Sequence, residues 1–147
     1  MIVRHCAGGV VFYANKVLLV KNDRGEWTLP KGKLNDQSLQ HESAILRVRE
    51  ETGVDANILD VAGDTMYEFF SRTRQQEVCN AVVWYVMEAN SSSCNIQGEL
   101  VDGRFFKVKD ALEKLTHSKE KSLVEISYKK YKEIKKKSPD STLSAVN

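Results

Sequence analysis

Apolar and polar positions follow a pattern typical of β-strands along most of the chain. Residues 2–13 and 17–20 are rich in Val, Leu, Phe and Ala, and the intervening Ala-Asn-Lys has the composition of a turn. These two segments are therefore predicted to form a hairpin. Four further segments are rich in β-branched and aromatic residues: 54–62, 65–71, 77–87 and 103–108. The polar residues between the second and third of them predict another hairpin.

The period changes to that of a helix between residues 38 and 52. Ala44 and Val48 are among the apolar residues that recur there at helical spacing. Ser38 is a candidate N-cap, and Gly53 suits the left-handed residue that commonly ends a helix. One helix is therefore predicted over residues 38–52.

Helical patterns also occupy residues 109–116 and 119–135, whereas residues 27–32 form a short extended piece that leads into a loop. One mixed β-sheet flanked by helices accommodates all these elements, so the expected class is α+β. Residues 1–137 are expected to form a single domain, followed by a disordered polar tail, 138–147.

Composition and charge narrow the range of functions. Of 147 residues, 41% are hydrophobic and 29% charged, which excludes a wholly disordered chain. The net charge of +2 argues against strong nucleic-acid binding. Residues 128–137 are locally basic. This segment is interpreted either as a solvated helix end or as a patch that contacts a polyanion. The oligomeric state is left open.

The three cysteines are odd in number and lack C-x-x-C spacing, so neither a disulfide framework nor a zinc site is expected. No apolar run is long enough for a membrane span, and no signal peptide is recognisable. We therefore expect a cytoplasmic protein in a reducing compartment, without a membrane partner.

Glu50 and Glu51 are the first candidates for chemistry. They lie in the last turn of the predicted helix, whose C-terminus carries partial negative charge, so a cation is needed to stabilise them. Arg47 lies one turn earlier and faces both. A hard divalent ion such as Mg²⁺ also suits carboxylate oxygens. The alternative is a pair of solvated surface glutamates.

The segment ahead of the helix adds positive charge. Lys31 and Lys33 flank Gly32 in a predicted loop and are candidates to contact phosphate, although solvated loop lysines are an alternative. Arg4 is a further substrate-binding candidate, or else a surface arginine. Tyr67 could stack on a nucleobase, or else pack in the core.

Residues 32–54 resemble the Nudix box, G-x5-E-x7-R-E-U-x-E-E-x-G-U, where U is a bulky aliphatic residue. The matching positions are Gly32, Val48, Glu50, Glu51, Gly53 and Val54. The resemblance implies an α/β/α sandwich with a central mixed sheet. It also implies hydrolysis of a pyrophosphate bond in a nucleoside diphosphate derivative, a small-molecule substrate. The order of elements is most similar to bacterial hydrolases of diadenosine polyphosphates. By the same resemblance, Mg²⁺ (or Mn²⁺) would be held by Gly32, Glu50, Glu51 and Glu99.

Three positions depart from the box. Its first glutamate falls at Ser38, its arginine at Leu46, and the following glutamate at Arg47. The last change replaces a carboxylate by a guanidinium beside the metal position, so Arg47 is a third candidate catalytic position.

Two arrangements follow from this exchange of charge. In the first, which we favour, Arg47 turns toward solvent, the two glutamates bind the ion, and Glu42 or Glu99 supplies the base. In the second, the Arg47 guanidinium folds back between Glu50 and Glu51 and replaces the metal, since it stays charged at any ordinary pH. The protein would then bind a nucleotide or contact another protein without hydrolysis.

Overall fold

The computed structural model describes residues 1–34 and 39–137, and within them seven strands form one sheet. The strands are β1 (Ile2–Tyr13), β2 (Lys16–Lys21), β3 (Trp27–Thr28), β4 (Lys31–Lys33), β5 (Ala56–Ser71), β6 (Gln76–Ala89) and β7 (Asp102–Lys107). The helices are α1 (Gln40–Thr52), α2 (Val108–Lys114) and α3 (Ser118–Lys137). The order along the sheet is β3-β2-β1-β6-β5, with β4 paired to β1 and β7 to β2.

The sheet is mixed, as predicted. β1 and β2 form the expected antiparallel hairpin, and Ala14 and Asn15 turn the chain with positive φ angles of 49° and 64°. Two successive positive φ angles give a turn whose twist matches that of the strands. On its other side β1 runs parallel to β6 along its length, from Ile2↔Val78 to Phe12↔Glu88. This parallel pair joins two hairpins that are far apart in sequence.

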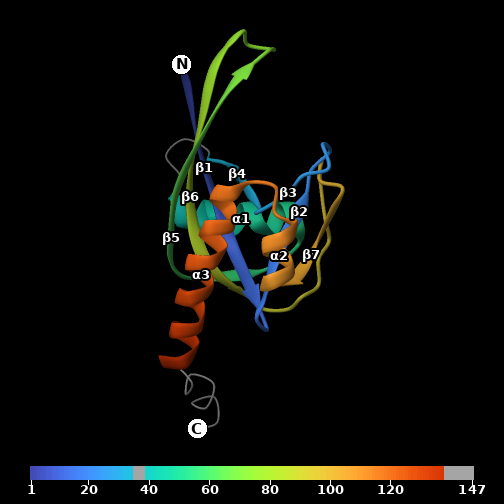
Figure 1. The fold of residues 1–147 in the computed structure, drawn as a ribbon, viewed down its shortest axis with the longest axis vertical. Coiled ribbons are helices and arrows are strands. Elements are labelled where there is room, and N and C mark those ends of the chain that lie inside the picture. Colours follow the sequence, from blue (N-terminus) through green and yellow to red (C-terminus); the bar gives the residue numbers. More distant parts are fainter. Residues whose placement is uncertain (35–38, 138–147) are drawn as a thin grey trace.

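The second hairpin differs from the prediction in one respect. Segments 54–62 and 65–71 were predicted as separate strands, but they belong to the single strand β5. Register shifts at Ile58/Asp60 and Val61/Gly63 mark irregularities where that strand bends without ending. The ribbon of β5 and β6 extends well beyond the rest of the sheet (Figure 1).

Helices cover both faces of the sheet, which confirms the α/β/α arrangement (Figure 1). On one face, Ala44 and Val48 of α1 pack against Ala7 and Val11 of β1. The core on the other face comes from α2, α3 and the opposite side of the same strands, and includes Val10, Phe12, Trp84, Ala111, Leu115, Val124 and Tyr131. Because side chains of β1 alternate between the faces, one strand supplies both cores.

The boundaries of α1 differ from the prediction at one end only. The helix begins at Gln40 with Leu39 at the N-cap and without a side-chain capping bond. Ser38, the predicted N-cap, and the predicted tail, 138–147, lie outside the described residues. Gly53 ends α1 in the left-handed conformation, with a φ of 73°, as predicted. None of the described helices combines the length and apolar character that crossing a membrane requires.

Candidate functional site

The segment that carries Gly32 is a strand and not the predicted loop. β4 pairs antiparallel with β1, in the register Cys6↔Lys33 and Gly8↔Lys31. Pairing with a central strand fixes the direction of each side chain, so Lys31 and Lys33 share one face and Gly32 faces the other. Gly32 therefore lies against α1.

Gly32 makes room for the side chain of Arg47. A Cβ atom at residue 32 would lie 2.5 Å from Cδ, 2.8 Å from Cγ and 3.2 Å from Cβ of Arg47. The arginine side chain is only 22% exposed, since its aliphatic part packs over the bare backbone of β4. The expectation that Arg47 turns toward solvent is therefore wrong.

A double-mutant cycle tests this packing. Gly32→Ala is expected to reduce the free energy of unfolding by about 1–3 kcal/mol, because the added methyl group overlaps the Arg47 side chain. In an Arg47→Ala background the same change should cost much less, since only the Cβ contact remains. Urea unfolding of the four proteins measures the coupling. Equal costs in both backgrounds would contradict the packing.

Arg47 forms an ion pair with one of the two glutamates. Its Nη1 lies 2.9 Å from Oε1 of Glu50, whose side chain is half exposed. The pair joins residues one turn apart on α1, and the guanidinium charge is permanent. The buried Nε of Arg47 has no hydrogen-bond partner among the described residues. The structure therefore agrees with the second predicted arrangement for Glu50, on which Arg47 folds back. No ion pair joins Arg47 to Glu51 among the described residues.

Glu51 lies in a different environment from Glu50. Burial raises the pKa of its carboxyl group to about 7, against the opposing effects of Lys31 and Arg47, and Glu50 raises it further. Glu51 lines a hollow of about 340 Å³ together with Lys31 and Glu99. This hollow is termed the carboxylate hollow below. A partly buried acid whose pKa is raised in this way lacks sufficient positive charge nearby.

The connector that carries Glu99 is anchored to the end of α1. The N–H of Gln97 donates to the Glu51 carbonyl at 2.9 Å, and the N–H of Asn95 donates to the Thr52 carbonyl at 2.7 Å. These bonds satisfy two carbonyl groups that the helix end leaves without partners. They also fix the connector, and with it Glu99, beside Glu51.

The carboxylates at this site are of the type that binds a divalent ion, but they are not arranged around a common point. Mg²⁺ prefers oxygen ligands, and Glu51 and Glu99 line one hollow. Within residues 1–34 and 39–137, however, no group of three or more His, Cys, Asp or Glu side chains is placed around a common point. Glu50 is not among the residues that line this hollow, and its carboxylate is paired with Arg47. An ion bound by Glu50 would therefore have to displace the Arg47 guanidinium.

A second hollow, of about 630 Å³, adjoins the first at Lys31. It is termed the tyrosine hollow, because Tyr67 lines it together with Arg4. Three of the four predicted substrate-binding residues thus surround one space. Lys33, the fourth, is exposed on β4 and lines neither hollow.

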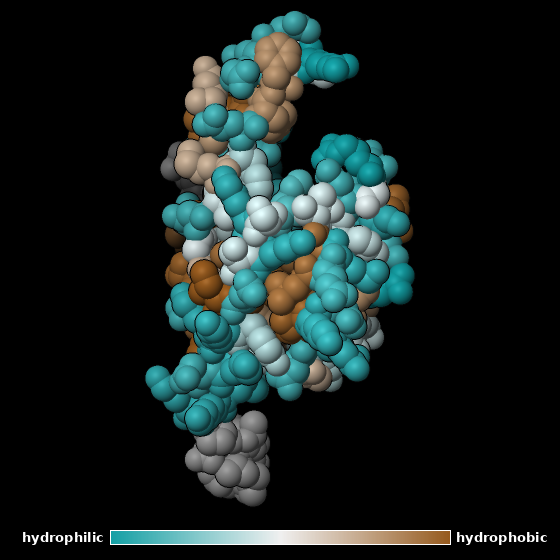
Figure 2. All heavy atoms as spheres, viewed as in Figure 1, coloured by the Kyte–Doolittle hydropathy of each residue, from teal (hydrophilic) through white to brown (hydrophobic). Residues whose placement is uncertain are grey.

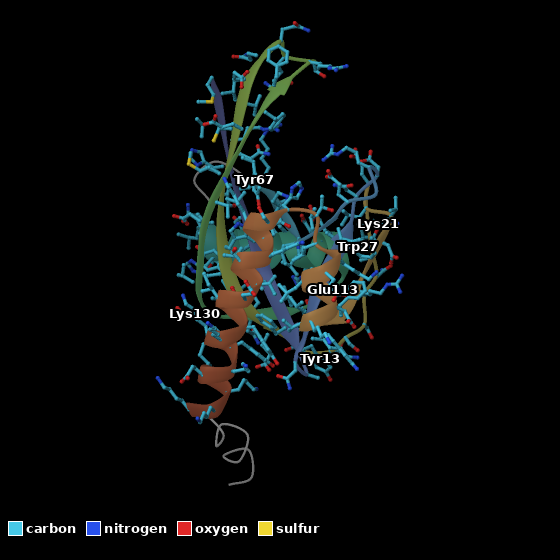
Figure 3. All side chains as sticks on the ribbon, viewed as in Figure 1. Tyr13, Lys21, Trp27, Tyr67, Glu113 and Lys130 are labelled. Carbon is cyan, nitrogen blue, oxygen red and sulfur yellow. The ribbon has the colours of Figure 1, made fainter. Side chains whose placement is uncertain are left out.

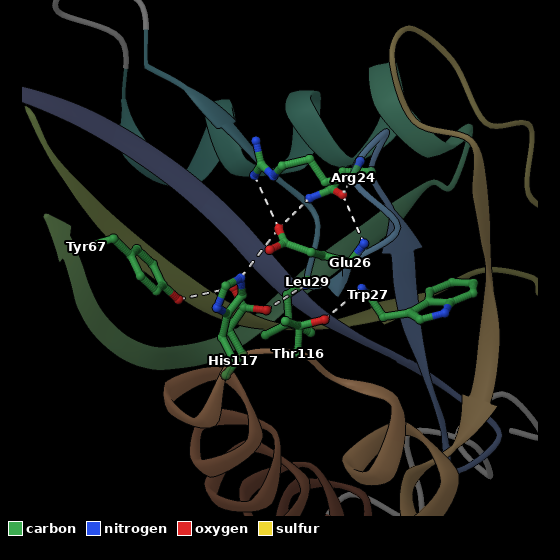
Figure 4. A network of polar contacts seen from close by, with 9 residues as sticks. Arg24, Glu26, Trp27, Leu29, Tyr67, Thr116 and His117 are labelled. Carbon is green, nitrogen blue, oxygen red and sulfur yellow. Dashed lines mark hydrogen bonds and ion pairs between the residues drawn. The ribbon is translucent and has the colours of Figure 1, made fainter. Parts of the chain in front are cut away.

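A buried glutamate that the sequence analysis missed organises the tyrosine hollow. Glu120 is only 1% exposed and accepts hydrogen bonds from the Leu29 N–H at 3.0 Å and the Tyr67 hydroxyl at 3.1 Å (Figure 4). Burial, reinforced by Glu120, raises the pKa of the Tyr67 hydroxyl, so this group remains a donor. The available signal was position: Glu120 lies three and four residues before Leu123 and Val124 on the buried stripe of α3.

The residues that line the tyrosine hollow include a polar cluster around Glu26, whose contacts are drawn in Figure 4. Glu26 accepts hydrogen bonds from Asn22 at 2.9 Å and Arg24 at 3.2 Å, and His117 lies 3.8 Å away. The bond from Asn22 is the main reason that the pKa of the Glu26 carboxyl group is lowered. Glu26 therefore places a stable negative charge at this hollow.

Comparison with known sequences gives a consistent result. A profile of the NUDIX domain matches residues 3–125. An RNA pyrophosphohydrolase from Erythrobacter litoralis (strain HTCC2594) is 34% identical over 71 residues, which cover 44% of this chain and 42% of that protein. The aligned region is thus less than half the length of this relative.

Solved structures share the fold. An Ap4A hydrolase from C. elegans, in a binary complex, superposes with a TM-score of 0.68 at 16% identity, covering 84% of this chain and 93% of that one. A dihydroneopterin triphosphate pyrophosphohydrolase from E. coli gives 0.69 at 14% identity, covering 85% and 96%. At these identities the likeness concerns the fold alone. The profile match spans most of the chain, including α1, so the chain belongs to the Nudix family.

Proposed function

We propose that this protein is a divalent-metal-dependent hydrolase of a pyrophosphate bond in a nucleoside diphosphate derivative. Dinucleoside polyphosphates are the first substrates to test. Family membership supports this proposal, and so does the similarity to an RNA pyrophosphohydrolase and to an Ap4A hydrolase. The proposed domain spans residues 1–137.

The observation that carries the proposal is the junction of the two hollows at Lys31. Carboxylates line one hollow and an aromatic ring lines the other, as a phosphate chain with bound ions and a nucleoside would require. We assign the phosphates to Lys31 and the nucleoside to Tyr67 and Arg4. Lys33 is left without a role in binding.

The proposed roles of the acidic residues follow from their positions. Glu51 and Glu99 would hold Mg²⁺ or Mn²⁺, with Glu50 as a further ligand once it leaves Arg47; the Gly32 carbonyl stays a candidate from the resemblance. Such an ion polarises phosphoryl oxygens and neutralises the leaving phosphate. Glu99 is preferred over Glu42 as the base that takes a proton from water, because Glu99 lines the carboxylate hollow and Glu42 does not.

A substrate panel tests the hydrolase proposal. Ap4A, ADP-ribose and nucleoside triphosphates would be incubated with the full chain in Mg²⁺, Mn²⁺ or EDTA, and the products separated by chromatography. The expected result is metal-dependent cleavage of at least one compound. Absence of cleavage throughout, with nucleotide binding retained, would contradict the hydrolase and support the second candidate described below.

The dependence of ion binding on pH gives a sharper prediction. Glu51 must lose its proton to bind a cation, and its pKa is about 7 in the ion-free protein. The apparent affinity for Mg²⁺ should therefore fall about tenfold per pH unit below pH 7 and level off above it. Calorimetric titrations between pH 5.5 and 8.5 measure this slope. A constant affinity over this range would remove Glu51 from the ion site.

The ion pair between Arg47 and Glu50 favours a second candidate function. If the Arg47 guanidinium remains paired with Glu50 when a ligand is bound, the protein would bind nucleotides without cleaving them. Equal affinity for a nucleotide in Mg²⁺ and in EDTA would distinguish this binding module from the hydrolase.

A further inference from the structure

A separate hollow lies between α2, α3 and the turn that joins β1 to β2. Its volume is about 800 Å³, and the side chains of Val108, Leu112 and Tyr128 supply its apolar floor. Figure 2 shows apolar atoms at the surface over α2 and α3, bordered by hydrophilic ones. An apolar depression with a polar border is typical of a docking site for another molecule.

Lysines from several elements surround this depression. A second hollow of about 620 Å³ shares the turn residues Ala14 and Asn15 with it. The two hollows together are termed the lysine-rimmed groove. The lysines that line it are Lys16, Lys107, Lys109, Lys132, Lys135 and Lys136. Only two acids do so, and one of them, Glu88, is already paired with Lys135 at 3.0 Å. This excess of positive charge is larger than the net charge of the whole chain, +2.

The groove lies apart from the candidate active site. Tyr13, at the groove, lies five positions along β1 from Gly8, which pairs with Lys31, a distance of about 17 Å along a strand. In the view of Figure 3, Tyr13 and Glu113 lie below Tyr67. A molecule bound in the groove would leave the two hollows at Lys31 open.

The aromatic contacts decide which class of anion fits. Single-stranded nucleic acid binds through cations together with aromatic faces on which its bases stack. Tyr128 stacks on Phe12, with 5.6 Å between ring centroids, and the Lys132 ammonium group lies 4.5 Å from the Tyr128 ring centroid. Because both contacts engage the Tyr128 ring, the surface that the larger hollow offers to an anchor is the aliphatic one of Val108 and Leu112.

We propose that the lysine-rimmed groove binds an acidic amphipathic segment of a partner protein. Bulky apolar side chains of that segment would enter the depression over Val108 and Leu112, and its carboxylates would face the lysines. This combination of an apolar seat and complementary charge matches the recognition of a helix in a groove. The proposal goes beyond the hydrolase function and does not depend on it.

The probe for this proposal is a fluorescent synthetic helix with leucines along one face and glutamates along the other. We expect the full chain to bind it in fluorescence anisotropy, and the double variant Lys107→Glu/Lys109→Glu to bind at least tenfold more weakly. The matched control, Lys129→Glu/Lys137→Glu, changes two exposed lysines of α3 outside the groove and should alter affinity less than twofold. Circular dichroism checks that both variants are folded.

Two further probes separate this partner from other anions. A peptide with serine in place of leucine, at unchanged charge, should bind at least tenfold more weakly if the apolar seat is occupied. Equal binding of both peptides, or equal losses in the two double variants, would overturn the proposal. Tighter binding of a dodecamer of uridylate or of phosphatidylserine vesicles than of the leucine peptide would also overturn it, in favour of nucleic acid or membrane respectively.

Discussion

Replacing Arg47 by glutamate is expected to raise the affinity for Mg²⁺ by at least about tenfold and to increase pyrophosphate hydrolysis. The change removes the guanidinium that holds Glu50 and adds a carboxylate beside Glu50 and Glu51. Two unit charges 4 Å apart interact with about 4 kcal/mol near a protein surface. Even a third of that energy corresponds to a tenfold change in an equilibrium constant.

Arg49→Glu is the matched control for this experiment. Arg49 lies two residues further along α1, its side chain is 57% exposed, and it pairs with Asp55 at 3.6 Å. The change in charge is identical, but Arg49 pairs with Asp55 and not with Glu50. Calorimetric titration with Mg²⁺ should therefore show a much smaller gain. If both variants gained affinity equally, the competition between Arg47 and the ion would be excluded.

Replacing Glu51 by glutamine should abolish hydrolysis, with a loss of at least about 100-fold, and yet stabilise the ion-free protein above pH 7. The folded state holds the Glu51 proton more tightly than a model carboxyl group of pKa 4.5 does, because its pKa is about 7. The unfavourable free energy of the buried charge is thus absent below pH 4.5 and fully present above pH 7. After allowance for solvent screening it amounts to about 1–2 kcal/mol.

Thermal unfolding in EDTA measures the gain in stability that is expected to accompany the loss of hydrolysis. At pH 8 the Tm of Glu51→Gln should exceed that of the original protein by roughly 2–6 °C, and near pH 4.5 the two should coincide. Glu125→Gln, an exposed change on α3, should alter neither Tm nor hydrolysis. A lower Tm at pH 8 for Glu51→Gln would show that the Glu51 carboxylate is adequately compensated by Lys31 and Arg47.

The strands and helices were largely predictable, because each follows from a local period of apolar residues. The division of β5 was wrong for a physical reason: the irregularities near Asp60 and Gly63 interrupt the alternation of side chains without ending the pairing with β6. The parallel pairing of β1 with β6 could not be predicted, since no local pattern specifies which strands become neighbours.

The chemistry of the site was predictable in type but not in geometry. Adjacent acids at a helix C-terminus indicated the need for a positive charge. In the structure Arg47 supplies that charge to Glu50 through an ion pair, whereas the pKa of Glu51 is raised by burial. The contact between Gly32 and Arg47 depends on β4 packing against α1, so neither residue alone revealed it. Glu120 was missed because a buried acid on an apolar stripe resembles a surface residue until its partners, Leu29 and Tyr67, are known.

The parallel pairing of β1 with β6 also constrains the order in which the nascent chain can fold. The hairpins β1–β2 and β5–β6 have short connections, so both form from local contacts. Their junction joins residues 76 positions apart and must await synthesis of β6. Until then the apolar residues from Val10 to Phe12, which are fully buried in the folded protein, stay exposed. We therefore expect chaperone binding to the nascent chain to be strongest during this interval.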